Sequence, residues 1–141
     1  INNQLLSKLN ELDFYKKQYP KSLGLEWVQN EVYPLIDSME NNHIHILRTL
    51  VEHIAIQISN IVDQNSSILF TGGGVFNSFL MNRISILSAN KVIITSKKII
   101  NYKEALIFSL LGLLRIENKN NCLKSVTGAN KDHSSGVIFK S

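Results

Sequence analysis

The stretch "SSILFTGGGVFNSFLMNRI", residues Ser66 to Ile84, raises the central question of this sequence. A short apolar run ends in three consecutive glycines, and a helical pattern begins at once. Glycine supplies no side chain to pack and costs backbone entropy on folding. The apolar run Ile68–Phe70 predicts a buried strand, and apolar residues at helical spacing predict a helix from Asn77 to Leu87.

The glycines follow the carboxyl end of the predicted strand. In an open parallel sheet, ligands bind beyond that end of the strands. A chain without Cβ atoms lets a ligand reach the backbone, and the N-terminus of the following helix favours phosphate. Gly72, Gly73, Gly74 and Asn77 are therefore candidate nucleotide-contacting residues. A tight strand–helix connection without a ligand explains the same glycines equally well, and the stretch is neither a G-x-G-x-x-G fingerprint nor a P-loop.

Upstream of this stretch the sequence predicts helices. Leucines at helical spacing predict an amphipathic helix over residues 3–13, and Pro20 then breaks the chain. Ser22 is a candidate cap for a second helix, which Pro34 should end or kink. A long third helix is expected from Asn42 to Asp63. Its apolar stripe consists of Ile44, Leu47, Val51, Ile54, Ile58 and Ile61, and Arg48 and Glu52 lie off the stripe at a spacing that allows an ion pair.

Downstream, Lys91–Thr95 predicts a second short strand. Lys103–Arg115 predicts a last helix that is apolar nearly all round and therefore buried between layers. Residues 117–141 form a polar C-terminal tail with a short terminal strand expected at Val137–Phe139. A strand–helix–strand unit with buried strands predicts a parallel pair and a right-handed crossover. Because two strands make a poor sheet, we expect other strands to be supplied by an absent portion or a partner.

Composition narrows the class of protein. The chain has 141 residues, 44% of them apolar and 18% charged, as expected for a single globular domain. The net charge of +4 is spread over scattered lysines without interleaved aromatic residues, which argues against nucleic-acid binding. No apolar run is long enough for a membrane span. The single cysteine, Cys122, excludes an internal disulfide and fits the cytoplasm.

"ILFTGGGVFNSFLMNRI" resembles the adenosine-binding segment of the sugar kinase, heat-shock protein 70 and actin superfamily. The closer resemblance is to the anhydro-N-acetylmuramic acid kinase family. It also includes, in order, "PKSLGLEWV" at residues 20–28, "KEALIFSLLGLL" at 103–114 and "NCLKSVTGA" at 121–129. The resemblance covers nearly the whole chain.

The resemblance implies a helix-rich α/β fold, a partial actin-like (ribonuclease H-like) domain with a small parallel sheet. It implies that residues 1–141 are the C-terminal, second domain of a two-domain kinase. The family uses ATP, with Mg²⁺, and water to convert 1,6-anhydro-N-acetylmuramic acid to N-acetylmuramic acid 6-phosphate in cell-wall recycling. The family's phosphate-binding loop and general base have no counterpart here, so we expect the chain alone to be inactive and the missing N-terminal domain to be its partner.

Glu104 is the candidate substrate-binding residue, because the matching glutamate of the family lies near the sugar. Asn101 and Glu104 also fit a capping box, which the spacing favours. Asn77 is likewise open between a helix cap and a ribose or phosphate contact. Ser125, Thr127 and Gly128 fit either an ordinary turn or a turn that closes over the cleft. The residues that we assign to structural or surface positions are Lys21, Ser22, His43, His45, His53, Cys122 and His133.

No histidine or carboxylate spacing in the sequence marks a metal site. Two other functions stay open: a non-catalytic nucleotide-binding module of the same fold, and a helical interaction module that docks through the helix at 42–63. A homodimer also stays open, because the sequence does not determine the oligomeric state.

Overall fold

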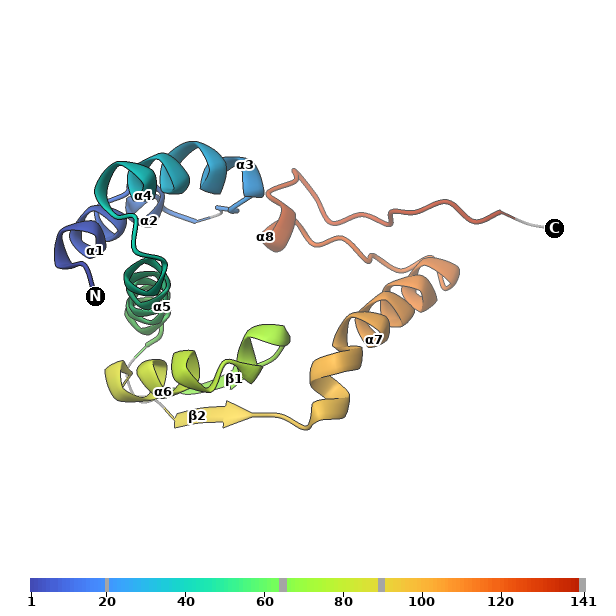
Figure 1. Ribbon diagram of the computed structural model, residues 1–141. Coiled ribbons are helices and arrows are strands. Elements are labelled where there is room, and N and C mark those ends of the chain that lie inside the picture. The colour runs from blue at the N-terminus through green and yellow to red at the C-terminus, as the bar shows by residue number, and fades with distance from the viewer. Residues whose placement is uncertain (20, 64–65, 89–90, 140–141) are drawn as a thin grey trace. The chain divides into compact units, whose positions relative to one another are not determined.

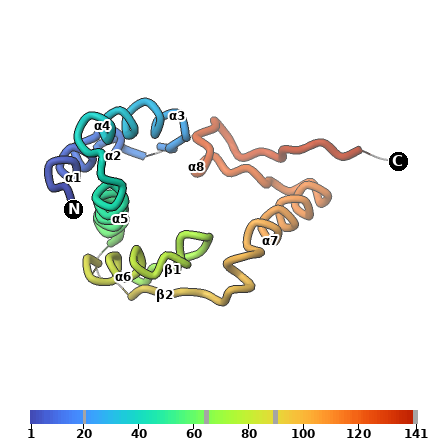
Figure 2. Tube along the Cα trace, viewed as in Figure 1, coloured from blue at the N-terminus to red at the C-terminus, as the bar shows by residue number. Residues whose placement is uncertain are grey.

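The computed structural model describes residues 1–19, 21–63, 66–88 and 91–139. The chain divides into two compact units, Ile1–Thr95 and Ser96–Ser141, which are described separately here. Figure 1 shows the helices and strands of both units, and Figure 2 traces the chain through them. The expectation of a single domain over residues 1–141 stays a prediction.

The first unit opens with α1 (Asn3–Asn10) and α2 (Asp13–Lys16). The side chain of Asn2 caps α1 by accepting a hydrogen bond from the Leu5 N–H, at 3.0 Å. Leu5 and Leu9 are fully buried, so the predicted amphipathic helix is confirmed, although it ends earlier than expected. Both leucines pack against Val32 and Ile36 in the first hydrophobic core.

Pro34 does not end the second helix. The helical segment runs through α3 (Leu25–Trp27), the π-helical η1 (Val28–Val32) and α4 (Tyr33–Met39). Proline has no N–H and its ring crowds the carbonyl one turn earlier, and a wide π turn is a common way to accommodate such a disruption. The N-cap residue is Gly24, so the prediction that Ser22 caps this helix is wrong. Pro20, predicted to break the chain, lies outside the described residues.

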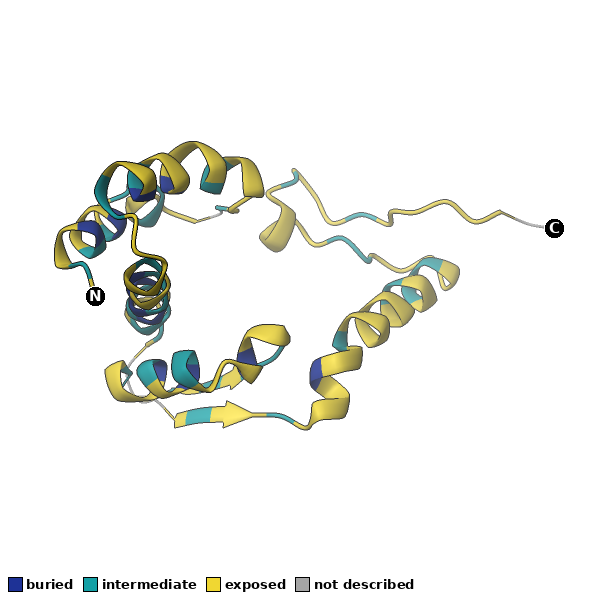
Figure 3. Ribbon diagram, in the orientation of Figure 1, coloured by how far each residue is buried: buried dark blue, intermediate teal, exposed yellow. Residues whose placement is uncertain are grey.

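The long helix is α5 (His43–Asn60), close to its predicted bounds. Asn42 caps it by accepting hydrogen bonds from the N–H groups of Ile44 and His45, at 3.0 and 3.2 Å. Its buried residues are Thr49, Glu52, His53 and Ala55, not the apolar stripe. Figure 3 shows that α5 carries buried and exposed positions side by side. The prediction of the helix is confirmed. Of its apolar stripe, Ile58 packs against the core of Ala55, Met81 and Ile84, whereas Ile44, Leu47, Ile54 and Ile61 are exposed.

Glu52 pairs with Arg83 rather than with Arg48. The Arg83 guanidinium donates Nε and Nη2 hydrogen bonds to the two Glu52 carboxylate oxygens, each at 2.7 Å. This bidentate pair connects α5 to α6 (Ser78–Leu87). The hydrogen bond from Arg83 holds the pKa of Glu52 below its usual value. Arg48 instead lies over the ring of Phe79, with its guanidinium carbon 4.0 Å from the ring centroid.

The predicted strand–helix–strand unit is confirmed. β1 (Ser67–Phe70) and β2 (Lys91–Ile94) form a two-stranded parallel sheet, connected through α6. Phe70 and Val92 lie on one face of the sheet and pack against a core of Ala55, Met81 and Ile84. α5 and α6 therefore cover the same face. On the opposite face, Leu69 and Ile93 are paired in register and exposed.

The second unit contains α7 (Lys97–Ile116) and α8 (Lys124–Thr127). α7 begins six residues before its predicted start, and its only buried residue among those described is Ile100. The expected burial of this helix between layers is therefore not seen. No strand forms at Val137–Phe139 in the described part of the tail, where Cys122 and His133 form an isolated antiparallel bridge. None of the described helices has the length and apolarity that crossing a membrane requires.

Removing Arg83 should destabilise the protein strongly. The Arg83→Met substitution leaves the nearly buried Glu52 carboxylate unpaired, and we expect the free energy of unfolding to fall by about 3 kcal/mol. Adding Glu52→Gln to this variant removes the unpaired charge and should recover part of the loss. Urea unfolding of the whole protein measures all three forms. Lys8→Ala, in the exposed Lys8–Glu11 pair, is the control and should cost less than about 0.5 kcal/mol. If Arg83→Met costs no more than Lys8→Ala, the Glu52–Arg83 pair does not stabilise the protein as we describe.

Candidate functional site

The three glycines form a tight turn between β1 and α6. Gly72 has a φ of 88° and ψ of 171°, and a short 3₁₀ helix, η2 (Gly73–Phe76), follows it. The N–H of Val75 donates to the Gly72 carbonyl at 3.2 Å, and the N–H of Asn77 donates to the Gly74 carbonyl at 3.1 Å. The turn therefore sits at the carboxyl end of a parallel strand, as predicted. The 3₁₀ turn includes Gly73 and Gly74, and α6 begins at Ser78, one residue after the start that the sequence predicts.

The backbone conformation favours glycine at only one of these three positions. Gly72 occupies the positive-φ region, which residues with a Cβ rarely adopt. Gly73 and Gly74 do not have positive φ. A Cβ at any of the three positions would meet no other atom within 4 Å. Packing therefore does not require glycine at positions 73 and 74, and open space lies beside their backbone for a ligand to approach.

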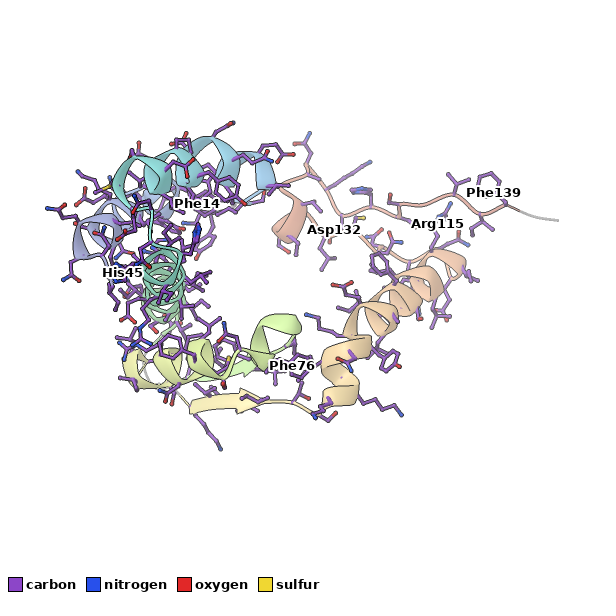
Figure 4. The ribbon with its side chains drawn as sticks, viewed as in Figure 1. Phe14, His45, Phe76, Arg115, Asp132 and Phe139 are labelled. Atoms are coloured by element: carbon purple, nitrogen blue, oxygen red, sulfur yellow. The ribbon has the colours of Figure 1, made fainter. Side chains whose placement is uncertain are left out.

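Asn77 is the N-cap of α6, as the cap interpretation predicted. Its Oδ1 accepts a hydrogen bond from the Leu80 N–H at 3.0 Å. Asn77 is exposed, and its Nδ2 group makes no hydrogen bond to the described residues. The cap thus uses one end of the amide, while the other end could donate to a ligand. Phe76, beside it, is 53% exposed, and its side chain is labelled in Figure 4.

Glu104 does not belong to a capping box. The N-cap of α7 is Ser96, whose Oγ accepts a hydrogen bond from the Ile99 N–H at 3.4 Å. Asn101 and Glu104 consequently lie inside the helix, and the predicted cap at this position is wrong. Glu104 is exposed and makes no hydrogen bond or ion pair to the described residues. Its carboxylate is available to bind a ligand.

The remaining sequence candidates have structural roles. Lys21 donates from Nζ to the carbonyls of Phe14 and Tyr15, at 3.1 and 3.3 Å. Gly128, with a φ of 72°, ends α8 at the predicted turn, which also contains Ser125 and Thr127. Cys122 is a free, half-buried thiol. No group of three or more histidine, cysteine or carboxylate side chains in the described ranges could hold a metal ion.

His53 takes part in a buried network that the sequence did not reveal. The Tyr15 hydroxyl lies 2.8 Å from His53 Nε2, and His53 Nδ1 lies 2.7 Å from Asn10 Oδ1. The Gln57 amide donates to the same Asn10 oxygen at 2.9 Å. These partners fit a neutral imidazole that accepts from Tyr15 and donates to Asn10. Burial lowers the pKa of His53 from 6.5 to about 4 and raises that of Tyr15.

Comparison with known proteins shows the family. The family model described as anhydro-N-acetylmuramic acid kinase matches residues 1–141. The chain is 33% identical over 155 residues to the anhydro-N-acetylmuramic acid kinase of Mannheimia succiniciproducens, covering 99% of this chain and 41% of the relative. It is 32% identical over 142 residues to that of Sulfurovum sp., covering 96% and 39%. It is 30% identical over 152 residues to that of Aliivibrio fischeri, covering 99% and 40%.

The chain therefore belongs to the anhydro-N-acetylmuramic acid kinase family, as its resemblance indicated. It spans about two-fifths of the length of these relatives. The comparisons do not bear out the more specific expectation that it is the C-terminal portion.

The pKa of His53 predicts how stability depends on pH. Below about pH 6.5 the unfolded state binds a proton on His53, whereas the folded state does not until the pH approaches 4. The stability that the neutral histidine contributes is therefore complete above pH 6.5 and is lost as the pH falls toward 4. The loss is at most ~1.4 kcal/mol per pH unit. Urea unfolding of the whole protein at pH 7 and pH 5 should show a smaller difference in His53→Gln than in wild type. The exposed His43→Gln is the control; identical pH dependence in wild type and His53→Gln would refute the assignment.

Proposed function

We propose that this chain is part of a kinase that phosphorylates 1,6-anhydro-N-acetylmuramic acid with ATP. In this reaction a water molecule opens the anhydro ring and O6 takes the phosphoryl group, giving N-acetylmuramic acid 6-phosphate. The observation that carries the proposal is the family match over residues 1–141, together with relatives that are named as anhydro-N-acetylmuramic acid kinases. Its place in metabolism is cell-wall recycling in the cytoplasm, on an actin-like fold.

The nucleotide contact that we propose is the turn Gly72–Gly74. Gly73 and Gly74 are exposed, have unobstructed space where a Cβ would be, and follow the carboxyl end of a parallel strand. Backbone at this position can approach the adenosine side of ATP closely. The Nδ2 group of Asn77, which the cap does not use, supplies a hydrogen-bond donor beside the same turn.

The sugar contact that we propose is Glu104. An ionised carboxylate accepts hydrogen bonds from sugar hydroxyls or from a water molecule more strongly than a neutral group does. The side chain is exposed and makes no hydrogen bond or ion pair to the described residues, so it needs no rearrangement to meet a ligand. The exposed position on α7 also means that replacing it should disturb folding little.

This chain supplies binding groups and not the whole reaction. We place the general base and most ligands of the Mg²⁺ that accompanies ATP in the remaining part of the protein, because none of the described residues forms a metal-binding cluster. Phosphoryl transfer depends mainly on positioning and on electrostatic stabilisation of the transferring group. A segment that fixes the nucleotide and the sugar can therefore be essential without doing acid–base chemistry, and we expect the chain alone to be inactive.

Two substitutions in the whole protein should each change the kinetic constants for a different substrate. Gly73→Val places a branched side chain where ATP would approach the backbone, so it should raise the KM for ATP more than the KM for the sugar. Glu104→Gln keeps the shape of the side chain and removes its charge. It should lower kcat/KM for the sugar about tenfold, equivalent to ~1.4 kcal/mol, and leave the KM for ATP nearly unchanged. The assay is ADP release with each substrate varied in turn.

Each variant is the control for the other, since both lie at exposed positions and neither should change the melting temperature by more than a few degrees. Equal effects of Gly73→Val on both substrates, or none, would mean that the glycines only form a turn. Wild-type sugar kinetics in Glu104→Gln would remove this residue from the sugar site. Absence of ADP release by the whole wild-type protein would contradict the proposed function itself.

A further inference from the structure

A cavity of about 330 Å³ lies in the first unit, between α2, the segment that follows α2 and the C-terminal end of α5. This volume falls within the range of roughly 300–1,000 Å³ that is usual for small-molecule sites. The lining is mainly aromatic and aliphatic, with few polar groups. The residues that determine its chemistry are Phe14, Tyr15, Tyr19, Lys21, Gln57 and Ile61.

The cavity lies toward the amino end of β1, away from the glycine turn. The helix α5 ends at Asn60, Ile61 follows it, and β1 begins at Ser67. The turn at Gly72–Gly74 comes after the opposite, carboxyl end of the same strand. A molecule in this cavity would therefore be additional to a nucleotide at the glycine turn.

Lys21 supplies the positive charge of the cavity. Its Nζ donates hydrogen bonds to the carbonyls of Phe14 and Tyr15 and lies 5.0 and 5.4 Å from the ring centroids of Phe14 and Tyr19. Phe14 is labelled in Figure 4. A lysine ammonium carries three N–H groups, so one is left for a ligand. No carboxylate is among the described residues that line the cavity, and an anionic group would therefore complement the charge of Lys21.

The walls favour a flat apolar body over a sugar ring. Tyr19, Leu23 and Ile61 line the cavity and are 70, 45 and 65% exposed, so a ligand would remove their apolar surface from water. Aromatic side chains also stack favourably on other rings. The hydroxyls of a saccharide would need more polar partners than the cavity provides, because the Tyr15 hydroxyl is already bonded to His53 and the Gln57 amide nitrogen to Asn10.

We propose that this cavity binds a small aromatic carboxylate. The ring lies against Tyr19 and Ile61, and the carboxylate accepts a hydrogen bond from the Lys21 ammonium. This recognition is independent of the proposed kinase reaction. A bound molecule would connect the segment after α2 to the end of α5, and by binding only the folded state it would stabilise the protein.

Calorimetric titration of the whole protein with 2-naphthoate tests this proposal. The control ligand is 2-naphthamide, which has the same rings and no charge. We expect a Kd for 2-naphthoate below about 1 mM, and binding roughly tenfold tighter than that of the amide. Lys21→Met should remove this preference for the anion. Lys17→Met, at an exposed lysine outside the cavity, should keep it.

Tyr19→Ala provides a second variant that does not change the charge. Because Tyr19 is largely exposed, this variant should fold normally, and we expect it to weaken the binding of both ligands. It keeps the proposal testable if Lys21→Met does not fold, since Lys21 also holds two backbone carbonyls.

Four results would overturn the proposal. Absence of saturable binding up to about 1 mM would show that the cavity is not a site in the whole protein. Equal affinity of the wild type for both ligands would exclude recognition of an anion. Binding of 2-naphthoate that Tyr19→Ala leaves unchanged would place the ligand elsewhere. Displacement of 2-naphthoate by an equal concentration of N-acetylmuramic acid would identify a sugar acid as the ligand.

Discussion

The bidentate ion pair between Glu52 and Arg83 determines how the first unit is organised. It joins the middle of the long helix α5 to α6, the helix that follows the glycine turn, through two hydrogen bonds of 2.7 Å. The small side chain of Ala55 then packs against Met81 and Ile84 above the sheet. Because the pair fixes α6 against α5, it also fixes where the turn at Gly72–Gly74 emerges from β1. On α5, the polar residues Glu52 and His53 are buried within the unit, whereas Ile44, Leu47 and Ile54 are exposed.

Local signals in the sequence were sufficient for the elements around the turn. The β1–α6–β2 unit, its parallel pairing and the cap by Asn77 follow from short-range patterns, and the structure confirms each of them. The orientation of α5 could not be predicted in this way. An apolar stripe shows that a helix has a face to bury, but the partner that covers it is set by distant residues such as Arg83 and Tyr15. The start of α7 was missed because Ser96 caps the helix and its first residue, Lys97, lies six residues before the predicted start.

The candidate site was predictable in part, for the same reason. A glycine run after a strand is a local signal, so its position at the carboxyl end of β1 was predictable. Only the structure separates Gly72, which needs positive φ, from Gly73 and Gly74, which do not. It also removes Glu104 from a capping role and so makes a ligand-binding role easier to test. The buried network around His53 joins residues more than forty positions apart, so no local sequence pattern predicts it.

Photoaffinity labelling of the whole protein with 8-azido-ATP tests most directly whether the glycine turn holds the nucleotide. Trypsin cleavage after Arg48 and Arg83 releases the turn on one peptide, residues 49–83, because no lysine or arginine lies between. We predict that this peptide carries the label, that excess ATP abolishes the labelling, and that Gly73→Val reduces it. Label found only on other peptides, while ATP still competes for it, would contradict the claim that Gly72–Gly74 contacts the nucleotide.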